Sequence, residues 1–129
     1  MNELPDLQAR MFLNVPRPYR DSTPESELLK RFADRFRLEE WPSPRLPEVY
    51  YDERALALGN SEYTSLHAKC IVVDARKALV TSANFTEAAQ MRNIEAGVLI
   101  LDPGFARSLI RQFEALIGNG LLQRVPGLQ

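Results

Sequence analysis

The sequence predicts an α/β fold in which a mixed β-sheet is flanked by helices. β-prone apolar runs alternate along the 129 residues with segments whose apolar residues recur at helical spacing. Two of the β-prone runs are separated only by Asp74-Ala75-Arg76-Lys77, which indicates a hairpin. Strand–helix alternation favours parallel pairs, whereas a hairpin is antiparallel, so the sheet is expected to be mixed. The length suits a single domain spanning residues 1–129.

The first half of the chain is expected to contain two strands and one helix. Residues 11–15 are a short apolar run that ends at Pro16, and residues 48–51 form a second one. Between them, Ser22 or Thr23 can cap a helix over residues 24–39, whose first position suits Pro24. The Pro-rich segment 41–47 cannot be helical, and residues 52–65 are expected to be mostly loop.

The second half is expected to hold the hairpin, a further strand and two helices. The β-prone runs of the hairpin are residues 69–73 and 78–81, and the further strand is 94–101. A short helix is predicted within 86–91. A longer helix begins at Asp102-Pro103 and is stopped by Gly118-Asn119-Gly120.

Composition and charge exclude several classes of protein. The formal net charge is −1, which argues against a long electrostatic contact with nucleic acid. No apolar run reaches the roughly 18 residues that span a bilayer, so no membrane insertion is expected. The N-terminus lacks the pattern of a signal peptide, and one cysteine cannot form an internal disulfide, so a cytoplasmic location is expected.

His67 and Lys69 are the first residues that suggest chemistry. They lie two positions apart at the start of a predicted strand, so the alternation of a strand points both side chains to one face. An imidazole and a fixed cation on one face suit a phosphate diester. A lone histidine is more often a structural or surface group, so this pair needs support from the rest of the chain.

Two further groups of polar residues follow the next strands. Ser82 and Asn84 come at the end of residues 78–81, just before the short predicted helix, where they could bind an anion. Taken alone, helix capping is the better explanation of these two residues. Asn93-Ile94-Glu95 begins the strand 94–101 and offers a carboxylate.

Taken together, these residues resemble the signature of the phospholipase D superfamily. The resemblance covers about residues 67–101 and consists of His67-x-Lys69, Asp74, Ser82-x-Asn84-x-Thr86 and Asn93-x-Glu95. Each fixed position would be matched by chance about one time in twenty, so the whole set is not a coincidence. The resemblance implies a phospholipase D-like half with one copy of the motif.

The resemblance also implies roles for the matched residues. His67 would attack phosphorus to form a phosphohistidine, or would protonate the leaving oxygen, without a metal or a cofactor. Lys69 and Asn84 would bind the phosphate, with Ser82 supporting that pocket, and Glu95 would orient the imidazole of His67. Asp74 is expected to serve the hairpin turn, and Thr86 and Asn93 are expected to be structural members of the motif.

The sequence resembles one branch of this superfamily more specifically and departs from it at two points. The segments 14–20, 67–74 and 81–89 resemble the phospholipase D-like components of the DISARM anti-phage system, which implies other defence subunits as partners. Thr81 stands where the superfamily commonly has glycine, so the backbone there should be extended. Only about ten residues precede the first predicted strand, whereas a complete unit has a further strand and helix there, so a shortened N-terminus is expected.

The chain contains one histidine, so two histidines cannot meet within it. A homodimer in which each chain supplies one motif would complete the site, and nucleic acid is the expected substrate. An alternative is a catalytically silent binding or accessory subunit of a defence complex with the same fold. A zinc site or a Ser-His-Asp site is disfavoured, because the chain has no clustered metal ligands and no Gly-x-Ser-x-Gly motif.

Overall fold

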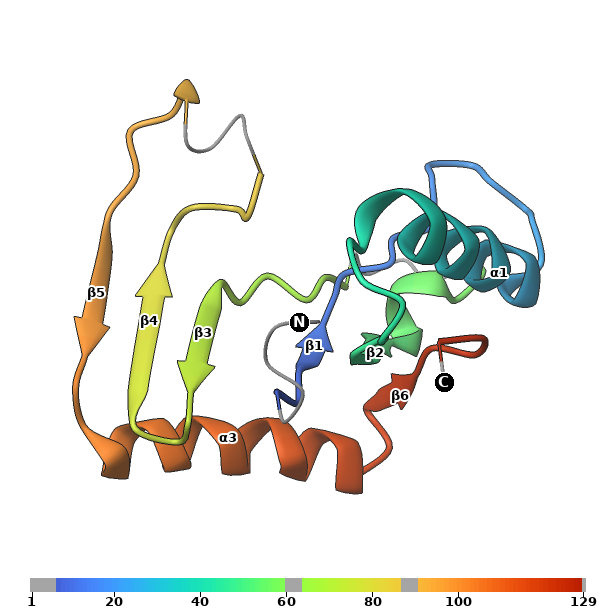
Figure 1. Ribbon diagram of the computed structural model, residues 1–129. Helices are drawn as coiled ribbons and strands as arrows, with labels where there is room; N and C mark the ends of the chain where they lie inside the picture. Colours follow the sequence, from blue (N-terminus) through green and yellow to red (C-terminus); the bar gives the residue numbers. More distant parts are fainter. Residues whose placement is uncertain (1–6, 60–63, 87–90, 129) are drawn as a thin grey trace. The chain divides into compact units, whose positions relative to one another are not determined.

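The computed structural model describes residues 7–59, 64–86 and 91–128, and its chain divides into two compact units (Figure 1). Unit 1 comprises residues 1–66 and 120–129, and unit 2 comprises residues 67–119. Each unit contains one three-stranded sheet and one main helix. The predicted α/β class is therefore confirmed, with the strands arranged in two small sheets. The single domain over residues 1–129 stays a prediction.

The sheet of unit 1 has mixed pairing. Its strands are β1 (Arg10–Phe12), β2 (Glu48–Asp52) and β6 (Leu122–Arg124), in the order β1-β2-β6. β1 is parallel to β2 and β6 is antiparallel to it. The first strand is thus shorter than the predicted 11–15, and β6 was not expected from the sequence.

The helix of unit 1 covers the apolar core of that unit. α1 (Glu25–Arg35) begins directly after Pro24 and continues as a π-helical turn, η1 (Phe36–Glu40), so the predicted helix 24–39 is confirmed within one residue at each end. It buries Leu29, Ala33 and Phe36. The core of this unit consists of Val15, Leu29, Ala33, Phe36, Val49, Tyr51, Leu56, Val125 and Leu128.

A charged residue is buried where β2 ends. The carboxylate of Asp52 accepts hydrogen bonds from the backbone N–H of Arg54 at 3.0 Å and from its guanidinium at 2.9 and 2.7 Å. The side-chain hydrogen bonds of Arg54 hold the pKa of Asp52 below its ordinary value. Asp52 thereby caps a 3₁₀ turn, η2 (Glu53–Leu56), in the segment predicted to be loop.

Unit 2 contains the predicted hairpin. Strands β3 (Cys70–Val73) and β4 (Lys77–Thr81) pair antiparallel, and β5 (Gly97–Ile100) pairs antiparallel with β4. The turn between β3 and β4 has positive φ at both Asp74 and Ala75, 53° each. The helix α3 (Pro103–Gly118), which Asp102 caps, lies against β3 and β4 (Figure 1).

The register of this sheet defines two faces with different surroundings. One face carries Cys70, Val72, Ala78, Val80, Val98 and Ile100, and the other carries Ile71, Val73, Leu79, Leu99 and Leu101. Ala78 is 0% exposed and Val72 and Ile100 are half-buried, so α3 packs on this part of the first face, whereas Val80 and Val98 of the same face are exposed. We call the second face the open face, because four of its five apolar side chains are exposed.

Two expectations about helices concern other parts of the chain. The short helix predicted within 86–91 falls largely on residues 87–90, which lie outside the described residues. Across the segments that the structure describes, no helix has the length and apolar character needed to cross a membrane.

Candidate active site

His67 and Lys69 lie immediately before β3. The backbone carbonyl of Lys69 accepts a hydrogen bond from the N–H of Thr81 at 3.0 Å, which continues the β3–β4 pairing by one residue. The ammonium of Lys69 donates to the carbonyl oxygen of His67 at 2.8 Å. His67 is exposed and Lys69 is half-buried. The pair is therefore solvent-accessible, and the pairing of Lys69 with Thr81 assigns Lys69 to the open face.

Ser82, Asn93 and Glu95 form a hydrogen-bonded cluster at the same end of the sheet. The hydroxyl of Ser82 donates to Oε2 of Glu95 at 2.5 Å, and the amide of Asn93 donates to Oε1 at 3.2 Å. The backbone N–H of Ala96 in turn donates to the Ser82 hydroxyl at 3.1 Å. Each carboxylate oxygen of Glu95 thus has its own donor, which fixes the orientation of the carboxylate.

This cluster differs in one respect from the roles that the sequence suggested. In the described part of the chain, the carboxylate of Glu95 is held by Ser82 and Asn93, and no hydrogen bond joins it to His67. The hydroxyl of Ser82 is occupied in the same contact. Asn93, expected only as a structural member of the motif, holds Glu95 directly, and its position two residues before Glu95 was the one signal of this contact in the sequence.

Thr81 and Gly97 are matched across the β4–β5 pair. A Cβ on Gly97 would lie 3.0 Å from Cβ of Thr81 and 3.1 Å from the carbonyl oxygen of Val80. The Thr81 hydroxyl donates to the carbonyl of Ala96 at 3.2 Å and accepts from the N–H of Ala83 at 3.1 Å. The side chain at position 81 therefore leaves little room for a Cβ opposite it. Thr81 is the last residue of β4, as expected for an extended backbone.

The other predicted site residues occupy turns and loops. Asn84 is exposed in the loop after β4, and its carbonyl accepts from the N–H of Thr86 at 2.8 Å. Asp74 is exposed in the β3–β4 turn, at the far end of the hairpin from His67. Within unit 2, the geometry thus brings His67, Lys69, Ser82, Asn84 and Glu95 to one end of the sheet and separates Asp74 from them.

The described residues at this end of the sheet include an exposed imidazole and an ammonium. Searching the described residues for three or more His, Cys, Asp or Glu side chains that could hold a metal ion finds no such group. An exposed imidazole beside an ammonium can attack a phosphorus centre and neutralise a non-bridging oxygen. The thiol of Cys70 belongs to the opposite face, and burial raises its pKa, so it is a poor nucleophile.

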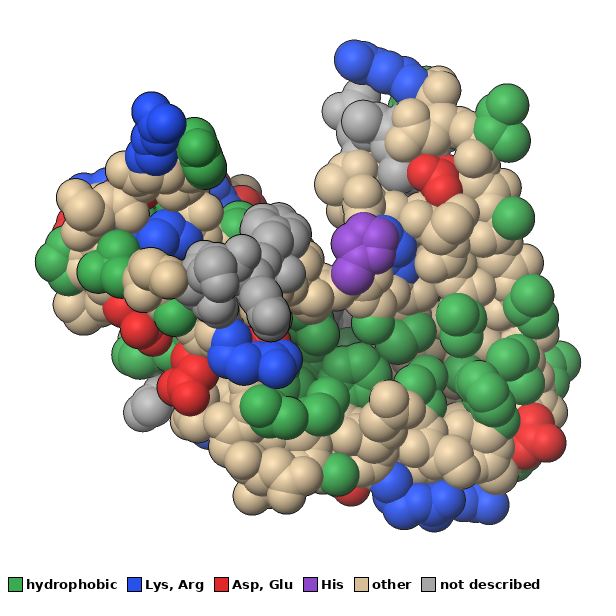
Figure 2. All heavy atoms as spheres, turned by 180° about the vertical axis from the view of Figure 1, so that it is seen from behind, with side chains coloured by type: hydrophobic (Ala, Val, Ile, Leu, Met, Phe, Trp, Pro, Cys, Tyr) green, Lys and Arg blue, Asp and Glu red, His purple; other side chains and the backbone are tan. Residues whose placement is uncertain are grey.

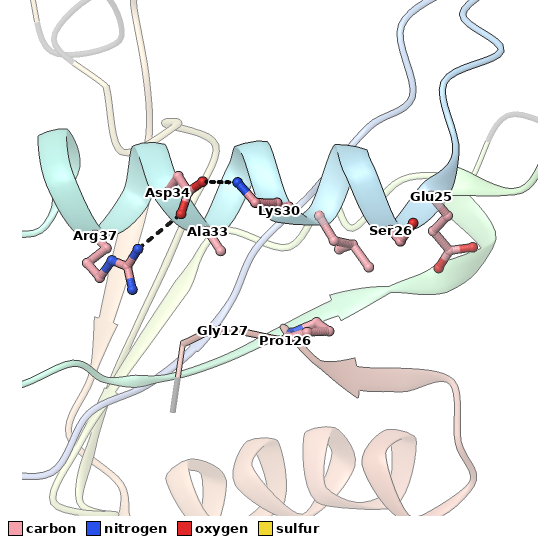
Figure 3. Close-up of a pocket in the computed structure, with 9 residues that line it drawn as sticks. Glu25, Ser26, Lys30, Ala33, Asp34, Arg37, Pro126 and Gly127 are labelled. Carbon is pink, nitrogen blue, oxygen red and sulfur yellow. Dashed lines mark hydrogen bonds and ion pairs between the residues drawn. The ribbon is translucent and has the colours of Figure 1, made fainter.

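A separate groove lies in unit 1 between α1 and the residues after β6 (Figure 3). Its volume is about 540 Å³, and its walls include Leu29, Ala33 and Pro126. The cations on its rim are already paired, because Lys30 and Arg37 both donate to the carboxylate of Asp34, at 2.9 and 3.0 Å. This groove contains none of the motif residues and offers no unpaired cation for a phosphate.

Comparison with known families decides the identity of the fold. The family model described as "Cardiolipin synthase, PLD-like domain" matches residues 30–117, which is more than half of the chain and includes every motif residue. The chain belongs to the PLD-like domain family. The family assignment rests on a match much longer than the motif, and it agrees with the resemblance found in the sequence.

One curated relative of this PLD-like chain is the DISARM protein DrmC of Bacillus paralicheniformis. The two are 50% identical over 42 residues, which cover 33% of this chain and 18% of the relative. The matched segment thus spans about a fifth of the length of that relative. No solved structure matches the chain.

Proposed function

We propose that this PLD-like chain hydrolyses phosphodiesters without a metal ion, at a site shared between two copies of the chain. The observation that supports the proposal is the gathering of His67, Lys69, Ser82, Asn84 and Glu95 at one end of the β3–β4–β5 sheet. An exposed imidazole, an ammonium and a rigidly held carboxylate are the groups that phosphoryl transfer through histidine requires.

The proposed reaction has two steps that exchange one bond each. In the first, the neutral imidazole of His67 attacks phosphorus, the P–N bond forms and the bond to the leaving oxygen breaks. The imidazolium of the second chain gives its proton to that oxygen. In the second step the imidazole of the second chain, now neutral, takes a proton from water. The water oxygen bonds to phosphorus, and the bond between phosphorus and the first His67 breaks. Lys69 and Asn84 would stabilise the charge on the non-bridging oxygens throughout.

Two chains are needed because the sequence has a single histidine. The nucleophile is a neutral imidazole and the proton donor is an imidazolium, and one residue cannot fill both roles in the same step. A twofold dimer supplies the second imidazole without further residues.

The substrate we propose is nucleic acid, and the setting is anti-phage defence. The support for the defence setting is the likeness to DrmC, whose name assigns it to DISARM. Because the net charge is −1, contact with the nucleic acid would be local to the motif, or other defence subunits would supply the rest.

A second candidate function is an accessory subunit of a defence complex that keeps the fold without turnover. The near-neutral charge favours it, because a nuclease that works alone usually needs a larger basic surface. Under this alternative the purified chain would be folded and would leave every diester intact.

Hydrolysis of bis(p-nitrophenyl) phosphate in the presence of EDTA tests the proposal. The wild-type chain is expected to release nitrophenol at a steady rate, and His67→Ala is expected to reduce the rate to the uncatalysed background. Gln112→Ala, an exposed change on α3, is the matched control and should retain the wild-type rate. Activity that EDTA abolishes, or that His67→Ala retains, contradicts the proposal.

A further inference from the structure

The loop that joins β1 to α1 presents an exposed aromatic ring beside an exposed cation. Tyr19 is 88% exposed, more than any other aromatic side chain in the described part of the chain. The guanidinium of Arg20 lies over its ring, with Cζ 5.2 Å from the ring centroid. At this exposure, the ring face away from Arg20 is open to solvent. Figure 1 shows the loop as an extended segment between the two elements.

Hydrogen bonds hold the backbone of this loop in one conformation. The guanidinium of Arg17 donates to the carbonyl oxygen of Leu56 at 2.6 Å, and to those of Asp21 and Thr23 at 3.1 and 2.5 Å. The backbone N–H of Asp21 donates to the carbonyl of Pro18 at 3.0 Å. The carboxylate of Asp21 accepts from the backbone N–H of Thr23 at 2.7 Å. A ligand that binds here therefore meets a loop that is already ordered, which removes much of the entropic cost of binding.

Arg20 occupies a strained position in this ordered loop. Its φ is 59°, in the left-handed region that residues other than glycine rarely adopt. Such residues persist only where the surrounding structure enforces them, and they gather at functional sites. Among the described residues, no carboxylate forms a salt bridge with Arg20, and the neighbouring carboxylate of Asp21 is held by Thr23. The charge of Arg20 is therefore available to an anion.

We infer that Tyr19 and Arg20 form a second binding site for nucleic acid, specific for single strands. A base would stack on the open face of the tyrosine ring, and the edge of the guanidinium would donate to a phosphate of the same strand. Bases in a duplex are covered on both faces by their neighbours, so only an unpaired base can stack in this way. The inference rests on the proposed function for the kind of polymer, but it uses none of the motif residues.

The surroundings of Tyr19 favour nucleic acid over a protein partner. An aromatic anchor in a protein interface is ordinarily surrounded by other apolar groups that exclude water. The residues beside Tyr19 in the chain are instead Pro18, Arg20, Asp21 and Ser22, of which three are polar or charged. Stacking on one exposed ring next to a cation needs no such apolar surround, because the base itself covers the ring.

The motif end of unit 2 gives a reason for a second contact. Figure 2, which views the molecule from behind, shows the single histidine at the surface with a basic side chain beside it. Because affinity for a polyanion rises with the number of phosphates that are neutralised, this small group of charges binds a long strand weakly. Tyr19 and Arg20 would add a stacked base and one phosphate contact to the affinity.

Fluorescence anisotropy with a fluorescein-labelled oligothymidylate tests the inference. The full chain carrying His67→Ala is used, so that the probe is not cleaved. Tyr19→Ala in this chain is expected to raise the Kd about 5- to 150-fold, since it removes one stacked base, whereas Tyr19→Phe keeps the ring and should retain the affinity. Leu38→Ala, which alters a 74% exposed apolar side chain of the same unit, is the matched control and should also retain it.

Two further measurements test the phosphate contact and the preference for single strands. Arg20→Gln should lower the slope of log Kd against log salt concentration by about 0.7, the value for one phosphate contact on a single strand. A labelled duplex of the same length should bind more weakly than the single strand. Far-UV circular dichroism checks that each variant is folded.

Several outcomes would overturn the inference. They are a chain that does not bind the oligothymidylate, a Kd that Tyr19→Ala leaves unchanged, and a loss of affinity that Tyr19→Phe or Leu38→Ala shares. A duplex bound as tightly as the single strand would reject the stacked base. The proposed function fails separately, when the wild-type chain releases no nitrophenol from bis(p-nitrophenyl) phosphate. Binding that depends on Tyr19 would in that case retain this site and reject the activity.

Discussion

The hydroxyl of Ser82 donates a 2.5 Å hydrogen bond to the carboxylate of Glu95, thirteen residues further along the chain. The bond joins the loop after β4 to the segment before β5, and Asn93 holds the second oxygen of the same carboxylate. The carboxylate that the motif predicts as the partner of the imidazole is therefore fixed from two sides, although no hydrogen bond joins it to His67 among the described residues. Such fixed carboxylates orient the catalytic histidine in many enzymes.

We expect Ser82→Ala to lower kcat for diester hydrolysis about 10- to 100-fold. The variant removes a hydrogen bond to a charged group, worth about 1.5–3 kcal/mol, from a residue that supports the transition state. Ser82→Thr keeps the hydroxyl and should recover most of the rate. Steady-state kinetics of the two variants check this expectation, and equal rates for Ser82→Ala and wild type would show that the contact has no part in the reaction.

We expect Gly97→Ala to destabilise the chain by about 1–3 kcal/mol, although alanine is ordinarily no worse than glycine in a strand. The added Cβ would meet Thr81 at 3.0 Å. Urea unfolding of Gly97→Ala, Thr81→Gly and the double variant measures the coupling between the two positions. The double variant should be more stable than the sum of the single changes implies. Strict additivity would contradict the matching of these residues.

Much of the fold could be predicted from the sequence, because the patterns that indicate helices and strands are local and repeated. The apolar stripe of α1, the Asp-Pro start of α3 and the hairpin between β3 and β4 all appear where the sequence indicated. The predicted capping by Ser22 or Thr23 was wrong, because the N-cap of α1 is Pro24 and no side chain caps this helix. β6 was missed because it is a three-residue strand that exists through its pairing with β2, which no local pattern records. The predicted strand 94–101 is shorter as β5, because the residues before Gly97 carry the contacts of Glu95 and Ala96 with Ser82.

The residues of the candidate site could be predicted from the sequence, but the contacts between them could not. The spacing of the motif identified His67, Lys69, Ser82, Asn84 and Glu95. The hydrogen bonds of Glu95 depend on how the loop after β4 folds back on the segment before β5. The exposure of the open face depends on which side of the sheet α3 covers, and alternation alone cannot decide that.

Asp52 should make stability depend on pH in the acid range. Its pKa is lowered in the folded state, so its contribution is fully present above the ordinary pKa of aspartate and is lost as the pH falls through the lower, folded pKa. Asp52→Asn should destabilise the chain by about 1–3 kcal/mol at pH 7, and the difference from wild type should shrink below about pH 4. Denaturant unfolding between pH 3 and 7 measures it. A difference that stays constant over this range would contradict the ionic role of Asp52.

Ala75→Gly should stabilise the chain by about 1 kcal/mol. Ala75 has a φ of 53°, a conformation in which its Cβ is crowded and which glycine adopts without that strain. Thermal unfolding of the variant beside wild type checks the expectation. A lower melting temperature would mean that the Ala75 side chain contributes more than its backbone strain costs.

Mixing wild-type and His67→Ala chains tests most directly whether two chains share one active site. When equal amounts are allowed to exchange subunits at constant total concentration, random pairing leaves about one quarter of the dimers with two histidines. If both imidazoles are required, turnover should fall to about a quarter of that of the wild-type chain alone. A fall to about one half would mean that each chain works with its own histidine, and it would contradict the shared site.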